Sequence, residues 1–428
     1  MTSDADAGED KMEKGVKREG LTPKEIADKY IAEFEEDTKR INCLEPTKKP
    51  RATEYIPQMI EMIQELLDKG FAYTTDLGVY FDVSKFPQYT RLNKQDMGKM
   101  REGAGKAEVM DLGKKSPVDF ALWFFKAGTH TQAIQTWPSP FSSPLVEGGE
   151  GFPGWHIECS VMARALLGKT IDIHLGGIEH ISVHHTNEIA QSESANGVKF
   201  VNYFLHNGHL LVDDGKMAKS EGTGIVLSEI IDKGYDPLVL RYFFLTAQYR
   251  SQQNFSWEAL DGSQKALSDL QNMVRSWKQD DRAGLSEEKM EKIDAYRRQF
   301  IQALENDLNV PAALATTWEM AKSNIPSPDK YDLIMDFDEV LGLSLGEQKT
   351  ENRKQKISEE IQELVKKRNQ LRKERKFAEA DEIRKQLEEK GYSIEDGSKG
   401  TVAKNFNTTN TTPRNPINTT NTTNPINE

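Results

Sequence analysis

The sequence predicts an α/β protein in which a mixed first part is followed by a bundle of helices. Two amphipathic helical segments and a strand-like segment alternate within the first 85 residues. From about residue 255 onward the composition becomes that of helices, with prolines at their expected boundaries. The length of 428 residues corresponds to two to four domains, at roughly 150 residues per domain.

Two helices and one strand are predicted at the start of the chain. Residues 22–25, Thr-Pro-Lys-Glu, combine a capping-box pair with proline at the first helical position, so a helix begins there. A second helix is expected over 57–69, where the apolar residues form one stripe and Gly70 ends it. The apolar segment 79–83 is typical of a strand.

The rest of the chain divides into four regions. Residues 85–151 are rich in glycine, proline and aromatic residues, which indicates loops around a cleft. A bundle of about four helices is expected between 255 and 345, followed by a charged helical hairpin over 353–390. Residues 406–428 repeat Asn-Thr-Thr and Asn-Pro-Ile-Asn. They contain too few apolar groups to offset the entropy of ordering, so we expect a disordered tail.

The composition excludes several classes of protein. No run of about 18 uncharged apolar residues exists, so a membrane span is excluded. The first twenty residues lack the apolar core of a secretory signal. The only cysteines, Cys43 and Cys159, are too few for a disulfide framework. Together these features favour a location in the reducing cytoplasm.

The charge balance restricts how a nucleic acid can bind. With 56 Lys and Arg against 68 Asp and Glu, the net charge is −12, and no global positive field exists. Residues 366–376 hold seven basic residues and one acidic residue, a local charge of +6. Such a run is usually the solvated face of a helix, but here it is also the best candidate for a surface that contacts phosphates.

One pair of side chains has the spacing of metal ligands. His184 and Glu188 are four residues apart, so on a helix both project from one face and can share a metal ion with Cys159. These residues alone leave two structural interpretations open. The pair can be an ordinary surface pair, and Cys159 can be a small buried apolar residue.

A second candidate for chemistry is the loop Gly215–Ser220, which carries Lys216 and Lys219. Two ammonium groups on a flexible loop can stabilise charge on the phosphates of a nucleotide, although a solvated basic turn is the alternative. Just before it, residues 206–209 (His-Asn-Gly-His) imitate a nucleotide-binding histidine motif. The apolar residues 210–212 that follow predict a strand and not a helix, so we do not assign this motif to a nucleotide.

Eight segments of the chain resemble the class I cysteinyl-tRNA synthetases and occur in the order of that family. They are GWHIECS (154–160), DIHLGG (172–177), HHTNEIAQS (184–192), HNG (206–208), KMAKS (216–220), DPLVLRY (236–242), NFS (254–256) and AEADEIR (378–384). Each segment is short, but eight in family order hardly arise by chance. The similarity extends across nearly the whole chain.

The resemblance implies an incomplete class I Rossmann-type catalytic domain, a helical bundle and a small C-terminal anticodon-binding domain. The family's N-terminal strand and helix, with their His-Ile-Gly-His motif, have no counterpart here, so we expect half of the ATP site to be missing and the chain alone to be inactive. The expected domains are a partial nucleotide-binding domain with a zinc site (1–200), a connecting segment with the KMAKS loop (201–260), the bundle (261–350), the anticodon-binding domain (351–405) and the tail (406–428).

The resemblance also implies a zinc site. One zinc ion per chain would be held by Cys159, His184 and Glu188 and would bind the thiolate of the substrate cysteine. Because zinc prefers sulfur to a hydroxyl oxygen, such a site rejects serine. Cys43 does not match the position of the family's remaining cysteine ligand.

Further roles follow from the same resemblance. Trp155 and His174 would line the amino acid pocket. Lys216 and Lys219 would be the catalytic lysines, with Lys219 bound to the ATP phosphates.

The implied activity is the ligation of cysteine to tRNA in two steps. The cysteine carboxylate attacks the α-phosphate of ATP, and a terminal ribose hydroxyl of tRNA(Cys) then takes the cysteinyl group from the adenylate. The expected partners are tRNA(Cys), cysteine and ATP, and a cytoplasmic monomer without membrane contact is expected. Two alternatives stay open: the related ligase that joins cysteine to an amino sugar, against which the hairpin 353–390 argues, and a non-catalytic protein that only binds zinc or tRNA.

Overall fold

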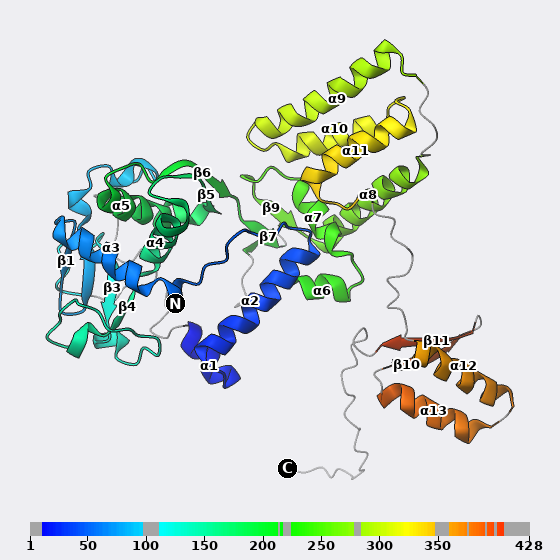
Figure 1. Ribbon diagram of the computed structural model, residues 1–428, viewed down its shortest axis with the longest axis horizontal. Coiled ribbons are helices and arrows are strands. Elements are labelled where there is room, and N and C mark those ends of the chain that lie inside the picture. The colour runs from blue at the N-terminus through cyan, green and yellow to red at the C-terminus, as the bar shows by residue number, and fades with distance from the viewer. Residues whose placement is uncertain are drawn as a thin grey trace, which may run out of the picture. The chain divides into compact units, whose positions relative to one another are not determined.

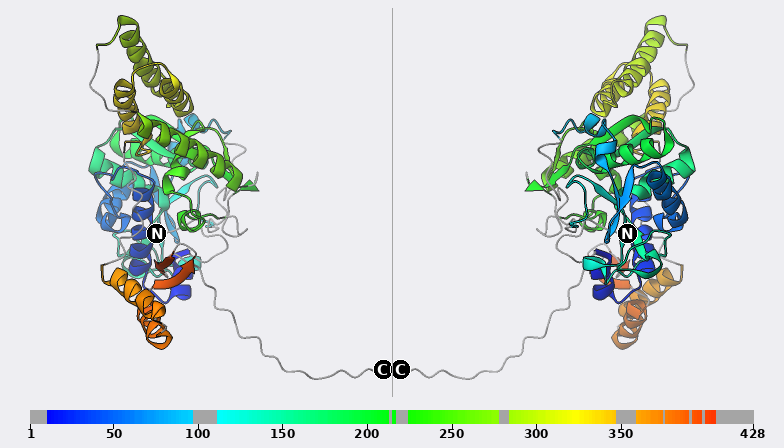
Figure 2. Two further views of the ribbon diagram at one scale, coloured as in Figure 1. Left: turned by 90° about the vertical axis from the view of Figure 1, so that its right-hand side faces the viewer. Right: turned by 90° about the vertical axis from the view of Figure 1, so that its left-hand side faces the viewer.

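The computed structural model describes residues 11–96, 111–212, 215–216, 224–277, 284–346, 359–374, 376–389, 392–397 and 400–405. The chain divides into two units, residues 1–346 and 347–428. In the first unit a mixed α/β part is followed by a bundle of helices, which lies at one end of the unit and away from the sheet β1–β4 (Figures 1 and 2). In the part of the chain that the structure describes, no helix has the length and apolar character needed to cross a membrane.

The first helices begin where the sequence predicts. α1 spans Lys11–Glu19 and α2 spans Pro23–Arg40. The Thr22 amide donates a hydrogen bond to Glu25 Oε2 over 2.8 Å, and the Glu25 amide donates to Thr22 Oγ1 over 3.3 Å. The predicted capping box is therefore confirmed.

α3 covers an antiparallel sheet. The helix spans Ile56–Asp68 and ends before Gly70, whose φ of 75° lies in the left-handed region that favours glycine. The buried face of α3 packs in one core with the second and third strands of this sheet. The strands, in their order across the sheet, are β1 (Ala72–Thr74), β2 (Gly78–Phe81), β3 (Phe120–Phe125) and β4 (Gly151–Pro153).

The strand predicted over 79–83 is shorter than expected. β2 ends at Phe81, and Val83–Lys85 form a 3-10 turn. The reason is that the Val83 amide donates to Asp119 Oδ1 over 2.9 Å, and not to a neighbouring strand. The competing carboxylate comes from the segment just before β3, so local sequence does not reveal this contact.

A parallel pair of strands carries most of the residues selected for chemistry. β5 (Ile171–Gly177) and β6 (Val201–Asn207) pair in parallel and are connected through α5 (His184–Asn196), which makes a βαβ unit. α4 (Trp155–Leu167) contacts α5 and precedes β5 in the chain. In Figure 1 both helices lie beside the two strands. The prediction of an α/β fold is thus confirmed.

A small sheet leads from this unit toward the bundle. β7 (Leu210–Val212) lies between β8 (Gly215–Lys216) and β9 (Gln253–Phe255) and runs parallel to β9. The strand predicted at 210–212 is confirmed, so the preceding histidine motif does not begin a helix. Two helices, α6 (Leu227–Asp232) and α7 (Pro237–Leu245), lie between β8 and β9.

Four helices form the predicted bundle. They are α8 (Trp257–Ser276), α9 (Glu287–Glu305), α10 (Val310–Lys322) and α11 (Ser327–Leu341). Pro311 and Pro328 lie in the first turns of α10 and α11, where an amide hydrogen is not needed within the helix. Phe300 and Phe337 stack in the core, with ring centroids 4.1 Å apart.

The second unit contains the predicted charged hairpin. Its elements are α12 (Glu359–Lys373), α13 (Phe377–Glu389), β10 (Tyr392–Gly397) and β11 (Gly400–Asn405). Ile383 and Leu387 of α13 pack against apolar residues of α12. Arg368, within the basic run 366–376, is only 2% exposed and so does not belong to a solvated face. The tail predicted over 406–428 lies outside the described residues.

Candidate functional site

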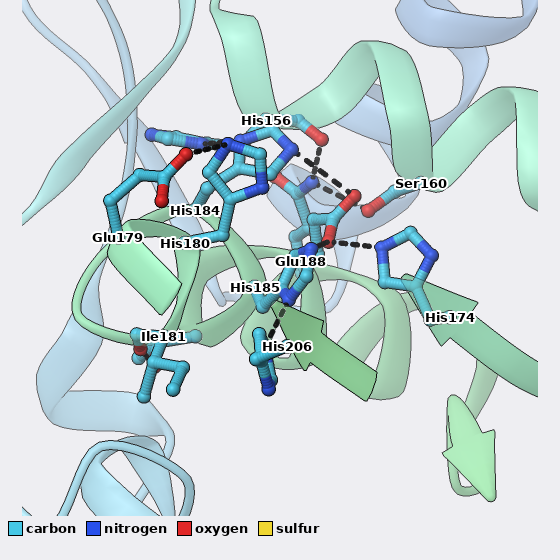
Figure 3. A network of polar contacts seen from close by, with 12 residues as sticks. His156, Ser160, His174, Glu179, His180, Ile181, His184, His185, Glu188 and His206 are labelled. Carbon is cyan, nitrogen blue, oxygen red and sulfur yellow. Dashed lines mark hydrogen bonds and ion pairs between the residues drawn. The ribbon is translucent and has the colours of Figure 1, made fainter. Parts of the chain in front are cut away.

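Six of the eight histidines gather where α4, β5, α5 and β6 meet (Figure 3). They are His156, His174, His180, His184, His185 and His206. Five pairs of neighbouring rings have centroids 4.5–5.1 Å apart. Imidazoles at such distances disfavour protonation of one another, so the cluster favours neutral rings.

Cys159, His184 and Glu188 come together at the centre of this cluster. Their ligand atoms all lie within 4.8 Å of one another. α5 presents His184 and Glu188 one turn apart, with His184 Nε2 3.5 Å from Glu188 Oε1, and α4 contributes Cys159. The sequence expectation that the helical pair and the cysteine can share an ion is thus geometrically possible, and the surface-pair alternative is wrong because both members of the pair are buried.

The carboxylate of Glu188 indicates that a cation fits here. Its side chain is fully buried, and among the described residues no nitrogen or hydroxyl group donates a hydrogen bond to Oε1. The carboxyl group also contacts the thiol of Cys159, which is only a weak donor. A buried carboxylate oxygen without a partner is costly, and a metal ion facing it would remove that cost. Sulfur, imidazole nitrogen and carboxylate oxygen together form a donor set that suits zinc better than magnesium or calcium.

Two further histidines contact these candidate ligands and orient them. His174 Nε2 lies 2.8 Å from Glu188 Oε2 and donates to it, which leaves Oε1 facing Cys159 and His184. His156 Nδ1 lies 2.8 Å from His184 Nδ1. A proton on His184 Nδ1, donated to His156, leaves Nε2 of His184 with the lone pair that a metal requires.

Burial sets the protonation states of the site. It lowers the pKa of His184 to about 3 and that of His156 to about 3, with neighbouring histidines adding to the effect. It raises the pKa of the Cys159 thiol and of the Glu188 carboxyl. The histidines are therefore neutral near pH 7, whereas the thiol loses its proton only when a positive charge binds beside it.

The expected pocket residues border this group. The Trp155 ring lies 4.4 Å from the His184 ring, centroid to centroid, and His174 holds Glu188. On the outer side, the carboxylate of Glu179 lies 3.8 Å from His180 Nε2 and 3.8 Å from a ring nitrogen of His209. Aromatic, imidazole and carboxylate groups thus border the candidate metal ligands.

The lysine loop is only partly described. The backbone of Lys216 lies in β8, opposite Leu211 of β7, and Lys219 lies outside the described residues. Because only two residues separate β6 from β7, the chain runs directly from the histidine cluster to this loop. The structure therefore connects the two sites along the chain without placing the lysine side chains.

The sequence interpretation missed several members of the cluster. His185 and His206 approach through Nδ1 and Nε2, 2.8 Å apart, although residues 206–209 had no assigned role. His156 and His180 also lacked one. A usable signal was present, since seven of eight histidines lie between residues 156 and 209.

Comparisons with known proteins identify relatives over most of the chain. Two family models match: "tRNA synthetases class I (C) catalytic domain" over residues 4–265 and "Cysteinyl-tRNA ligase anticodon binding domain" over residues 354–402. A cysteine–tRNA ligase of Treponema denticola is 39% identical over 94% of this chain and 85% of its own length. A cysteine–tRNA ligase 1 of Burkholderia lata is 41% identical, over 94% and 81%. A cysteine–tRNA ligase of Caldicellulosiruptor saccharolyticus is 39% identical, over 92% and 84%.

Proposed function

The chain belongs to the class I cysteinyl-tRNA synthetases, and from this premise we propose that its histidine-rich site activates cysteine with ATP for transfer to tRNA(Cys). The family is one of ligases, and both parts of such a ligase are matched in order, the catalytic domain and the anticodon-binding domain. The second match favours tRNA over a small amino sugar as the acceptor. The boundary expected near residue 350 is supported by the division between the two units after residue 346.

Recognition of cysteine is proposed to rest on Cys159, His184 and Glu188. A zinc ion held by these residues supplies a strong preference for a thiolate over a hydroxyl. Glu188 would offer Oε1 to that ion, because His174 donates a hydrogen bond to Oε2. The observation that carries the proposal is the buried, unpartnered Glu188 Oε1 in a group of sulfur, nitrogen and oxygen donors.

The remaining residues are proposed to position the reacting groups. Trp155 and His174 border the amino acid, and Lys216 and Lys219 stabilise charge on the phosphates of ATP while the cysteine carboxylate attacks the α-phosphate. Little covalent chemistry falls to the protein in this reaction, so orientation and electrostatic stabilisation account for most of the rate.

The second unit is proposed to read the tRNA. Lys366, Lys367, Arg372 and Lys376 are exposed and belong to the basic run, so they can contact phosphates in an otherwise acidic chain. We further propose that the chain works as a monomer in the cytoplasm. Its two cysteines are free thiols, which suits a reducing compartment.

Metal analysis and cobalt spectroscopy test the proposal on the protein as it is. Zinc content should be about one ion per chain in the wild type and strongly reduced in Cys159→Ser, whereas Cys43→Ser serves as the matched control and should keep its zinc. After replacement of zinc by Co²⁺, added cysteine should increase the thiolate-to-cobalt absorption, and added serine should not. Equal zinc in both variants, or the same response to both amino acids, would refute the proposed site.

A further inference from the structure

The turn between α9 and α10 holds two residues in a conformation that L-amino acids rarely adopt. Asp307 and Leu308 have φ angles of 56° and 52°, both in the left-handed region. Asp tolerates this region better than Leu does, and two such residues in a row are uncommon. Strained backbone of this kind persists only where its surroundings determine it, and it concentrates at functional positions.

Three consecutive residues from the connection between α7 and β9 hold Asp307. The Gln248 side-chain amide donates to the Asp307 carbonyl oxygen over 3.0 Å, and the Tyr249 hydroxyl donates to Asp307 Oδ1 over 2.9 Å. The Arg250 guanidinium forms an ion pair with Oδ2. Both members of the ion pair are exposed, so it contributes little by itself, and the three contacts together determine the position of the turn.

The same connection touches the crossover from β6 to β7. The Gly208 amide donates to the Tyr249 carbonyl oxygen over 2.8 Å. A Cβ on residue 208 would lie 2.6 Å from the Ser251 carbonyl oxygen, so only glycine permits this approach. Gly208 stands between His206 of the histidine cluster and β7, whose partner strand β8 contains Lys216.

We propose that Asp307 is a positioning residue that fixes the crossover 206–210 against the helical bundle, through Tyr249 and Gly208. The crossover leads from the histidine cluster to the lysine loop, so its position sets how the two sites lie relative to each other. We call the contacts of Asp307, Tyr249 and Gly208 the clamp. The role of the clamp in the reaction rests on the proposed function, whereas the existence of the clamp does not. Because cysteine and ATP must meet in a narrow geometry, a loosened crossover slows the chemical step more than it weakens the binding of either substrate.

Three variants separate the backbone from the carboxylate. Asp307→Gly removes the side chain and relieves the left-handed strain. Asp307→Asn keeps the left-handed preference and an acceptor for Tyr249. Glu305→Ala changes an exposed residue two positions away and serves as the control.

Hydrogen exchange of the peptide 206–212, measured by mass spectrometry on the full chain, tests the clamp. In Asp307→Gly this peptide should exchange about tenfold faster than in the wild type, because local opening becomes easier while the global stability is retained. Asp307→Asn should lie between the two, and Glu305→Ala should match the wild type. Equal exchange rates in Asp307→Gly and the wild type, or the same acceleration in the control, would overturn the proposal.

A kinetic measurement separates positioning from stability. In cysteine-dependent exchange of pyrophosphate into ATP, Asp307→Gly should lower kcat by about tenfold or more, with an unchanged KM for cysteine, zinc content and thermal unfolding midpoint. A kcat that falls only together with the unfolding midpoint would overturn the positioning role. Where the wild type itself shows no exchange activity, the hydrogen-exchange comparison decides on the clamp alone.

Discussion

Replacement of Glu188 by glutamine should make the metal-free protein more stable than the wild type and the zinc-loaded protein less stable. Glu188 is fully buried, one of its oxygens has no hydrogen-bond donor among the described residues, and burial raises its pKa. Glutamine has nearly the same shape, carries no charge and can still accept the hydrogen bond from His174. Removal of this buried charge should raise the free energy of unfolding by about 1–3 kcal/mol.

Zinc should reverse the order of stability of the wild type and the Glu188→Gln variant. A ligand present at about 1,000 times its dissociation constant stabilises the folded state by about 4 kcal/mol. The wild type should gain that amount, and the glutamine variant should gain little of it because one of three protein ligands is lost. The gain from zinc exceeds the cost of the buried charge, so the wild type becomes the more stable protein.

The pH dependence in EDTA provides an independent check. Burial raises the pKa of Glu188 above its ordinary value of 4.5, so the charged form is disfavoured in the folded protein. Below the unfolded-state pKa the group is neutral in both states, and glutamate and glutamine should then give equal stability. Above the folded-state pKa the full cost is present. The advantage of glutamine should therefore grow as the pH rises from about 4.5 toward neutrality.

Urea unfolding of the full chain in EDTA and in zinc measures these differences. Glu158→Gln is the matched control, because Glu158 is buried on α4, burial raises its pKa to about 7, and it does not belong to the metal group. The control should gain stability in EDTA and keep the response to zinc. If Glu188→Gln responds to zinc as the wild type does, Glu188 is not a ligand. If it is less stable than the wild type in EDTA, the argument from buried charge fails.

Three further outcomes are expected. Zinc affinity should rise by up to about tenfold per pH unit near neutrality, because the Cys159 thiol must lose a proton to bind the ion. His184, with its pKa lowered to about 3, is already neutral and adds no pH dependence. Competition with a chelator measures the affinity, and an affinity that does not change with pH would contradict this prediction. Changing four exposed basic residues of the second unit to glutamine should weaken the salt dependence of tRNA binding. The slope of log affinity against log salt concentration should become less negative by roughly 0.7–0.9 per lost phosphate contact. Filter binding measures this slope, and an unchanged slope would mean that these residues only form a solvated face. The four are Lys366, Lys367, Arg372 and Lys376. Phe337→Ala should lower the free energy of unfolding by about 3–5 kcal/mol, because the buried ring stacks on Phe300. The zinc content should not change. A decrease of less than about 1 kcal/mol in urea unfolding would contradict the assigned packing.

The helices and their local chemistry could be predicted from the sequence. The capping box of α2 involves residues three apart, and the pair His184 and Glu188 shares a face of α5 because a helix turns every 3.6 residues. Proline positions predicted the starts of α10 and α11 in the same way. All of these depend on neighbours within one or two turns, so a short stretch of sequence is sufficient to determine them.

Contacts between elements were decided by the tertiary structure. β2 ends early because Asp119, 36 residues away, takes the amide of Val83. His206 joins the histidine cluster because β6 pairs with β5, and Arg368 is buried although its neighbours in the basic run suggest a solvated face. Spacing along a helix determines the direction of a side chain relative to its own helix only. The groups that a side chain contacts depend on the packing of the whole chain. The hydrogen bond from His174 to Glu188 therefore forms only in the folded protein.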